Sequence, residues 1–186
     1  FTLAGDPTAV SASVIKGEGD VACVPVNLAS VLYTKTNGAY VCAAVNTLGV
    51  LNVVTGDTGL ARFEDLAGRT VYMTGKGATP EYAMNYLLER AGLAGQVTLE
   101  FKSEPTEVLS ALMADHAAVG VLPEPFKTAA IAKSEGKLTS PLNLTDVWDE
   151  LAGDTGSKLL TGVTVVRRAF AEEHPEAVAE FLRCRK

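Results

Sequence analysis

Short apolar runs alternate with helical segments along almost the whole chain, and this alternation limits most strongly how the chain can fold. The first two expected strands cover residues 1–5 and 21–26, and helices are expected after them at residues 7–16 and 27–35. These strands are nearly continuous apolar runs, which are typical of parallel strands covered on both faces. The order of elements therefore predicts an α/β architecture.

The third apolar run, YVCAAVNTLGVLNVV, covers residues 40–54 and is too long for one ordinary strand. A glycine-rich break, TGDTG, follows it, and we expect the chain to cross into a second domain near residues 54–59. The alternation then begins again with strands expected at residues 70–75, 97–103 and 117–122, each followed by a helix. A late strand at residues 161–168 predicts a return crossing near residues 161–163.

Two α/β lobes follow from this pattern, the second inserted into the first. Lobe I is expected to comprise residues 1–56 and 162–186, and lobe II residues 57–161. Before the expected strand at residues 161–168, residues 138–158 are of mixed character, with one short helical stretch. The chain opens on a strand-like run and stops inside a helical pattern, so we expect a fragment of a longer protein, with material missing at both ends.

Composition excludes several classes of protein. Of the 186 residues 47% are hydrophobic and 20% charged, near the average of globular domains. A formal net charge of −6 provides no basic surface, so nucleic acid is not expected as a partner. No apolar run approaches the roughly 18 to 20 uncharged residues that a membrane-spanning helix needs.

The cysteines do not indicate a metal or redox centre. The chain has three, Cys23, Cys42 and Cys184, with no CxxC pair and no histidine at the spacing of metal ligands. Cys23 and Cys42 lie in strand-like runs and are expected to be buried as small hydrophobic side chains. We expect no metal site and no cofactor.

The stretch MTGKGATPEY, residues 73–82, places a lysine between two glycines at a strand-to-helix turn. It does not match the phosphate-loop signature, in which the lysine follows the second glycine, and Pro80 stands where a dinucleotide fingerprint needs its third glycine. Gly75 and Gly77 permit a tight turn, Thr79 is a candidate cap, and Lys76 adds a cation near helix N–H groups that favour anions. The alternative is a purely structural turn.

Three further joints carry candidate polar groups. Glu124 stands between two prolines in VLPEPF and is either a ligand-facing carboxylate or part of a rigid joint. Asn27 is expected to cap the helix that follows VPV. Asn46 and Thr47 lie midway along the overlong apolar run, where polar groups are expected to face a cleft or solvent. His116 and His174 have no nucleophile nearby, so no catalytic residue is expected.

Five segments together resemble one family: GDVACVPVNLASVLYTKT, AAVNTLGVLNVV, FEDLAGRTVYMTGKGATPEY, VGVLPEPFKTAAI and TGVTVVRRAFAEEHPEAVAEFL. They resemble the substrate-binding proteins of ABC importers, in the type II periplasmic-binding fold and the cluster that handles nitrate, sulfonates, taurine and thiamine-pyrimidine precursors. The resemblance implies two hinged lobes that close on a small-molecule ligand and dock on a membrane permease. It also implies a monomer in an extracytoplasmic location, periplasmic or lipoprotein-anchored, and a missing first strand and helix of lobe I.

The resemblance also implies which turns line the ligand cleft. The residues carried over are Asp6, Pro7, Val26, Asn27, Asn46, Thr47, Gly75, Lys76, Gly77, Ala78, Thr79, Glu124, Thr161 and Gly162. Lys76 would complement an anionic group, whereas Glu124 would favour an amine or a ring N–H. The expected ligand is therefore zwitterionic or heterocyclic.

Two other classes share this fold and stay open. A relative of the fungal thiamine-pyrimidine synthase would use Lys76 as a Schiff-base lysine for a pyridoxal cofactor, although the cysteine-rich iron site of the fungal enzyme has no counterpart here. The effector domain of a LysR-type regulator would need a DNA-binding segment upstream. A sheet edge exposed by the missing strand is a possible contact with a second copy.

Overall fold

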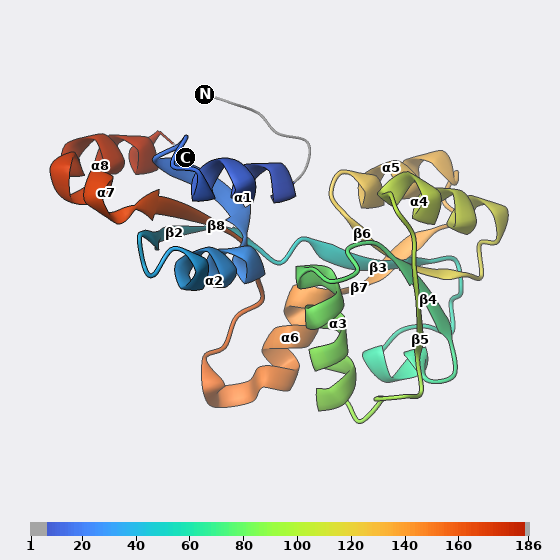
Figure 1. The fold of residues 1–186 in the computed structure, drawn as a ribbon. Coiled ribbons are helices and arrows are strands. Elements are labelled where there is room, and N and C mark those ends of the chain that lie inside the picture. Colours follow the sequence, from blue (N-terminus) through green and yellow to red (C-terminus); the bar gives the residue numbers. More distant parts are fainter. Residues whose placement is uncertain (1–6, 185–186) are drawn as a thin grey trace. The chain divides into compact units, whose positions relative to one another are not determined.

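The computed structural model describes residues 7–184, and within this range the side chains of residues 7–9 and 154 lie outside the description. The chain divides into two compact units (Figure 1). The first is formed by the described residues up to Leu48 and from Leu160 onward, and the second by Gly49–Leu159. No helix in the described part of the chain combines the length and the apolarity that crossing a bilayer demands.

The first unit is built on a three-stranded sheet in which the last strand of the chain lies in the middle. The order is β1 (Val21–Pro25), β8 (Leu160–Arg167), β2 (Tyr40–Leu48), and β8 is antiparallel to both neighbours. The expected side-by-side parallel strands are therefore wrong here, because the returning strand separates β1 from β2. The helices of this unit are α1 (Pro7–Ile15), α2 (Val26–Lys35), α7 (Arg168–Glu173) and α8 (Pro175–Arg183).

One face of this small sheet carries the core of the first unit. The buried cluster is formed by Val14, Val24, Leu32, Tyr40, Val163 and Val165. Because side chains alternate along a strand, Val163 and Val165 of β8 face this core, whereas Gly162 and Thr164 face the other side. Thr164 is nevertheless fully buried. The second face of the sheet therefore holds a buried polar group.

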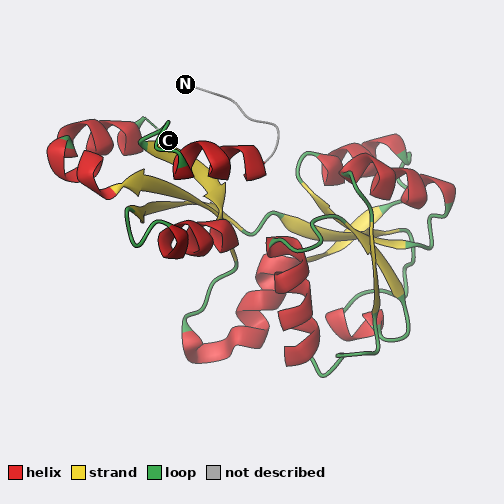
Figure 2. Cartoon of the chain, viewed as in Figure 1, coloured by secondary structure: helices red, strands yellow, loops and turns green. Residues whose placement is uncertain are grey.

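The second unit contains a five-stranded sheet of mixed direction (Figure 2). Its order is β5 (Thr98–Phe101), β4 (Thr70–Met73), β6 (Val119–Pro123), β3 (Leu51–Thr55), β7 (Thr139–Asn143). β4 is parallel to β5 and β6, as the apolar runs predicted, while β3 is antiparallel to β6 and β7. The carboxyl ends of β4, β5 and β6 consequently lie along one edge of the sheet.

Helices cover both faces of this sheet (Figure 1). One face packs against α3 (Thr79–Arg90) and α6 (Leu144–Ala152), and the other against α4 (Pro105–Ala114) and α5 (Phe126–Lys133). Short 3-10 turns occupy Phe63–Leu66 and Gly153–Thr155. Tyr86 of α3 stacks on Trp148 of α6 with ring centroids 4.3 Å apart. Two separate apolar layers therefore stabilise the second unit.

The overlong apolar run is two strands that belong to different sheets. β2 ends at Leu48, and β3 begins at Leu51 in the second unit. The break lies at Gly49, where an added Cβ would stand 2.0 Å from Thr145 Oγ1, so only glycine fits. Residues 49–56, expected in the first lobe, therefore lie in the second unit, and residues 160–161 lie in the first.

Several expected details of the elements are also corrected. The mixed stretch after residue 138 contains β7, which its polar composition concealed. The helical pattern at the end of the chain forms two helices, α7 and α8, separated at His174 with Pro175 in the first turn of α8. The strand expected at residues 1–5 lies outside the described residues.

Replacing Leu87 with alanine is expected to destabilise the protein by about 2 to 5 kcal/mol, because the side chain is fully buried and its removal leaves a cavity. Urea unfolding measures the change in free energy. Glu89→Ala, at an exposed position on the same helix, is the control and should change it by no more than about 0.5 kcal/mol. Equal effects of the two substitutions would contradict the described packing of α3.

An ion pair beside β3 predicts a pH-dependent effect. Arg69 Nη1 donates to Asp57 Oδ2 over 2.5 Å, and this bond, followed by one from the Gly59 N–H, lowers the pKa of Asp57. A carboxyl group whose pKa is lower in the folded state than in the unfolded state stabilises the fold at pH values above its ordinary pKa of about 3.9. This contribution disappears as the pH falls through the folded-state pKa.

Asp57→Asn should therefore lower the melting temperature at pH 5 to about pH 7 and should have progressively less effect below about pH 4. The control is Glu64→Gln, which removes a more exposed ion pair with Arg62. A difference in melting temperature that stays constant from neutral pH down to about pH 2 would contradict the role of this ion pair.

Candidate ligand-binding site

A depression of about 260 Å³ lies where the ends of the three strands of the first unit meet. It is lined by Cys23, Val24, Pro25, Asn46, Thr47, Thr161 and Gly162. These residues stand at the carboxyl ends of β1 and β2 and at the amino end of β8. In open α/β sheets, ligands bind outside the carboxyl ends of strands. The depression is therefore the candidate binding site of this unit.

Gly162 brings the strand ends together. It is paired with Pro25 of β1 on one side and with Thr47 of β2 on the other. A Cβ added at Gly162 would lie 2.5 Å from Asn46 Oδ1 and 3.0 Å from Thr47 Oγ1. The lack of a side chain at this position lets the polar groups of β2 lie close over β8.

Four polar side chains form a continuous row across the sheet, which we call the polar seam: Cys23, Thr164, Asn46 and Thr47. Cys23 Sγ lies 3.8 Å from Thr164 Oγ1, and Asn46 Nδ2 donates to the same hydroxyl oxygen over 3.3 Å. Thr47 Oγ1 donates to Asn46 Oδ1 over 2.8 Å. The seam holds the Asn46 amide in one orientation.

Thr161 completes the rim of the depression. Its hydroxyl donates to the carbonyl oxygen of Leu48 over 2.5 Å and lies 3.4 Å from that of Thr47. This bond fixes the end of β2 against the start of β8. All the residues that line the depression are uncharged, so it offers hydrogen bonds and apolar contact but no formal charge.

The structure brings four of the predicted site residues together in this depression: Asn46, Thr47, Thr161 and Gly162. Val26 and Asn27 do not line it. Val26 packs against the core cluster, and Asn27 lies in the first turn of α2, whose N-cap is Pro25, so the expected cap at Asn27 is wrong.

Two other predicted residues cannot be placed in the site. Asp6 lies outside the described residues. Pro7 begins α1, and its side chain is not described.

Three lining residues, Cys23, Val24 and Pro25, were not among the predicted site residues. Cys23 and Cys42 were expected to be buried, but all three cysteines of the chain are exposed. The reason is the alternation of β1: Val24 faces the core at 3% exposure, which turns Cys23 to the opposite face. Strict alternation, applied to this apolar run, is the signal that would have placed Cys23 correctly.

The turn after β4 has the tight backbone that its glycines predicted. Gly75 and Gly77 have φ values of 86° and 73°, and a Cβ on Gly75 would lie 2.7 Å from the Pro80 ring. Lys76 is exposed. The Gly77 N–H donates to the Glu81 carboxylate, so part of the expected anion cradle is occupied by the protein itself.

Two residues of this turn have structural roles. Ala78 is the N-cap of α3, so the expected cap at Thr79 is wrong. Thr79 is the first residue of α3 and is buried at 8% exposure. The turn therefore offers Lys76, rather than the threonine, to solvent.

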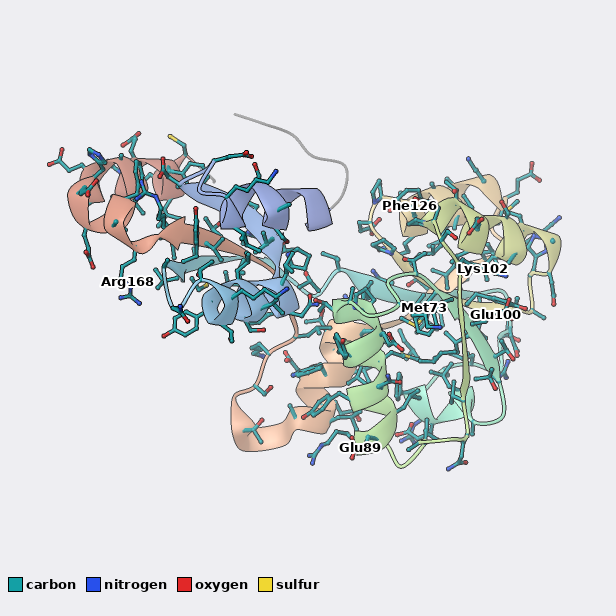
Figure 3. All side chains as sticks on the ribbon, in the orientation of Figure 1. Met73, Glu89, Glu100, Lys102, Phe126 and Arg168 are labelled. Carbon is teal, nitrogen blue, oxygen red and sulfur yellow. The ribbon has the colours of Figure 1, made fainter. Side chains whose placement is uncertain are left out.

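Glu124 makes several contacts at the start of α5. It pairs with Lys127 and accepts hydrogen bonds from the Thr128 hydroxyl over 2.8 Å and from the Thr128 N–H over 3.3 Å. These contacts lower the pKa of Glu124 below its usual range, and the bond with Lys127 makes the largest contribution. Figure 3 labels Phe126, the first residue of α5, and Met73 and Lys102, at the ends of β4 and β5. Glu124 is thus an ionised carboxylate at the strand-end edge of the second unit.

Comparison with known proteins places the chain in context. The profile of the NMT1/THI5-like family matches residues 2–186. No curated protein matches the chain. An ABC transporter structure from Parabacteroides distasonis has a TM-score of 0.75 at 24% identity, over 99% of this chain and 60% of that one.

Sulfonate-binding proteins are also among the structural neighbours. The periplasmic aliphatic sulphonate binding protein SsuA from Escherichia coli has a TM-score of 0.69 at 15% identity, over 96% of this chain and 57% of that one. The alkanesulfonate-binding SsuA from Xanthomonas axonopodis, bound to MOPS, has a TM-score of 0.58 at 16% identity, over 95% and 57%. The chain thus spans about three fifths of their lengths, and the likeness shows the type II periplasmic-binding fold.

Gly162→Ala is expected to destabilise the protein by about 1 to 3 kcal/mol, because the new methyl group would displace the Asn46 and Thr47 side chains. Gly19→Ala is the matched control in the same unit, since a Cβ there meets nothing within 4 Å. Urea unfolding compares the two variants. A Gly162→Ala protein as stable as the control would contradict the close approach described for the polar seam.

Proposed function

Because the chain belongs to the NMT1/THI5-like family, we propose that it is the solute-binding part of an ABC importer, which captures a small polar or heterocyclic nutrient and delivers it to the membrane permease. The observation that carries this proposal is the depression at the strand ends of the first unit. Its rigid amide and hydroxyl groups suit recognition of a small polar molecule. The chain binds its ligand and does not transform it.

In this proposal each unit contributes its own binding surface. The first unit contributes the depression, with Asn46 as its central polar group. The second contributes the turn Gly75, Lys76, Gly77, Ala78 and Thr79, together with Glu124. Lys76 and Glu124 supply charges of opposite sign, which suits a zwitterionic ligand or a heterocycle with a ring N–H.

The proposed function also implies a location and partners. The periplasmic sulphonate-binding neighbour supports an extracytoplasmic location, either free in the periplasm or anchored as a lipoprotein. The partners are the small-molecule ligand and the importer permease, and the protein acts as a monomer. Size-exclusion chromatography with light scattering tests the monomer directly.

The first test is to identify the natural ligand. The full-length protein is purified without refolding, the bound small molecule is released with acid or heat, and mass spectrometry identifies it. Isothermal titration then measures its affinity for protein from which ligand has been removed. Absence of any released molecule, together with no thermal stabilisation by any member of a nutrient library, would exclude solute binding.

Asn46→Ala is expected to weaken binding of that ligand by at least about tenfold, since one lost hydrogen bond in a desolvated site contributes about 1.5 kcal/mol. Lys35→Ala, at an exposed position on α2 away from the depression, is the control and should bind as the wild type does. Unchanged affinity of Asn46→Ala would remove the depression from the binding site.

The same titration tests the surface of the second unit. Lys76→Ala and Glu124→Ala should each weaken binding if these side chains contact the ligand. Wild-type affinity in both variants would exclude Lys76 and Glu124 as ligand residues. The turns that carry them would then have a structural role only.

A further inference from the structure

We infer that Thr164 is a positioning residue of the candidate site: it does not line the depression, but it fixes the amide of Asn46, which does. This role rests on the proposed function, because it concerns the central polar group of the proposed binding surface. Every contact that supports it lies within the first unit.

A β-bulge directs the Asn46 side chain. Val45 of β2 is paired with Val163 of β8, and Thr47 with Gly162, so two steps along β2 correspond to one step along β8. Asn46 is the extra residue between these two pairs. Such a bulge bends the strand locally and redirects a side chain. The backbone of β2 therefore sets the direction in which the Asn46 side chain leaves the strand.

The bulge does not by itself fix the amide group. The last torsion of an asparagine side chain has a broad energy profile, so contacts at the amide atoms have to set its orientation. Nδ2 of Asn46 donates to Thr164 Oγ1 over 3.3 Å, and Oδ1 accepts from the Thr47 hydroxyl over 2.8 Å. Thr47 lines the depression, whereas Thr164 is fully buried. The contact with Thr164 is therefore the one that a bound molecule does not reach.

Thr164 is an anchor in the middle of the sheet. It lies on the central strand β8, opposite Cys23 of β1 on one side and Ala44 of β2 on the other. Its χ1 angle is stiff because the side chain is β-branched. The side chain of Ala44 is short, and Asn46, two residues further along β2, reaches the hydroxyl as a diagonal neighbour. The position of this hydroxyl thus depends on the sheet and not on a bound molecule.

The same hydroxyl contacts a second residue of the depression. Cys23 Sγ lies 3.8 Å from Thr164 Oγ1 and comes from β1, whereas Asn46 comes from β2. Thr164 therefore supports lining side chains from both outer strands. Of these two side chains only Asn46 carries an amide whose donor and acceptor ends must be told apart, so we expect the effect of Thr164 on binding to pass through Asn46.

The chemical consequence is an amide that is ordered before binding. An asparagine amide has two hydrogens to donate and two lone pairs on its oxygen. One hydrogen is donated to Thr164 and one lone pair is used by Thr47, so one donor and one acceptor remain at fixed positions. A group that is already ordered loses less conformational entropy when a molecule binds.

Two substitutions separate the hydroxyl of Thr164 from its volume. Thr164→Val keeps the branched shape and removes the acceptor, whereas Thr164→Ser keeps the hydroxyl. In the full-length, ligand-free protein, nuclear magnetic resonance measures how fast the Nδ2 hydrogens of Asn46 exchange with water, and their signal is identified by its absence from Asn46→Ala. We expect exchange at least about fivefold faster in Thr164→Val, because one hydrogen bond is lost, and nearly wild-type exchange in Thr164→Ser. An unchanged rate in Thr164→Val would overturn the inference.

Isothermal titration measures binding, with the molecule released from the purified wild-type protein as the probe. Thr164→Val should weaken its affinity at least about fivefold, while the melting temperature changes by no more than about 3 °C, and Thr164→Ser should bind nearly as the wild type does. The control is Thr55→Val, the same change at a fully buried threonine of the second unit, which should leave the affinity unchanged. A larger fall in the melting temperature of Thr164→Val would indicate a structural role and overturn the inference.

A double variant shows whether Thr164 acts through Asn46. Once Asn46→Ala has removed the amide, adding Thr164→Val should have no further effect on affinity, since nothing is left to position. Additive losses would overturn the positioning role, because they would place the effect of Thr164 elsewhere in the unit.

The proposed function and the role of Thr164 fail in different ways. Unchanged affinity of Thr164→Val, in a protein whose wild type binds the probe, overturns the role of Thr164 and leaves the proposed function intact. If the wild-type protein releases no molecule and no member of the nutrient library stabilises it, the proposed function fails and the role of Thr164 in binding fails with it.

Discussion

The pairing of β8 between β1 and β2 is the interaction on which the first unit depends. β1 and β2 make no hydrogen bonds to each other, so the sheet exists only because the chain returns from the second unit and pairs with both. The same pairing sets Gly162 between the ends of the outer strands, and it places Thr164 where both Cys23 and Asn46 reach it. The fold and the candidate site of this unit thus have one cause.

The second unit shows how local capping decides the electrostatics of a surface. Helix starts at the end of a parallel sheet ordinarily form a positive edge. Here Glu81, Glu107 and Glu124 each accept from backbone N–H groups near the start of their own helix. The carboxylates that satisfy these N–H groups therefore also offset the positive end of each helix dipole.

Much of the local structure follows from the sequence. The alternation of apolar runs predicted most helices and strands, because burial of apolar side chains on strands and helix faces has a period that is visible in the residues. Gly75 and Gly77 indicated a tight turn, and Asn46 and Thr47 stood out as polar groups in an apolar run. The caps expected at Asn27 and Thr79 were wrong. Helix α2 begins one residue before Asn27, and α3 begins at Thr79 itself, so each expected cap lies inside its helix.

What the sequence determined by itself was most of the helices and strands and the α/β class, since these depend on the periodic burial of apolar side chains. Tertiary structure alone decided that residues 40–54 divide between two sheets at Gly49, because that break depends on Thr145, far along the chain. It also decided which face of β1 carries Cys23 and where the hydroxyl hydrogens of Thr47 and Thr161 point. Such features depend on strand order and on hydrogen bonds between distant residues, and neither leaves a periodic pattern in the sequence.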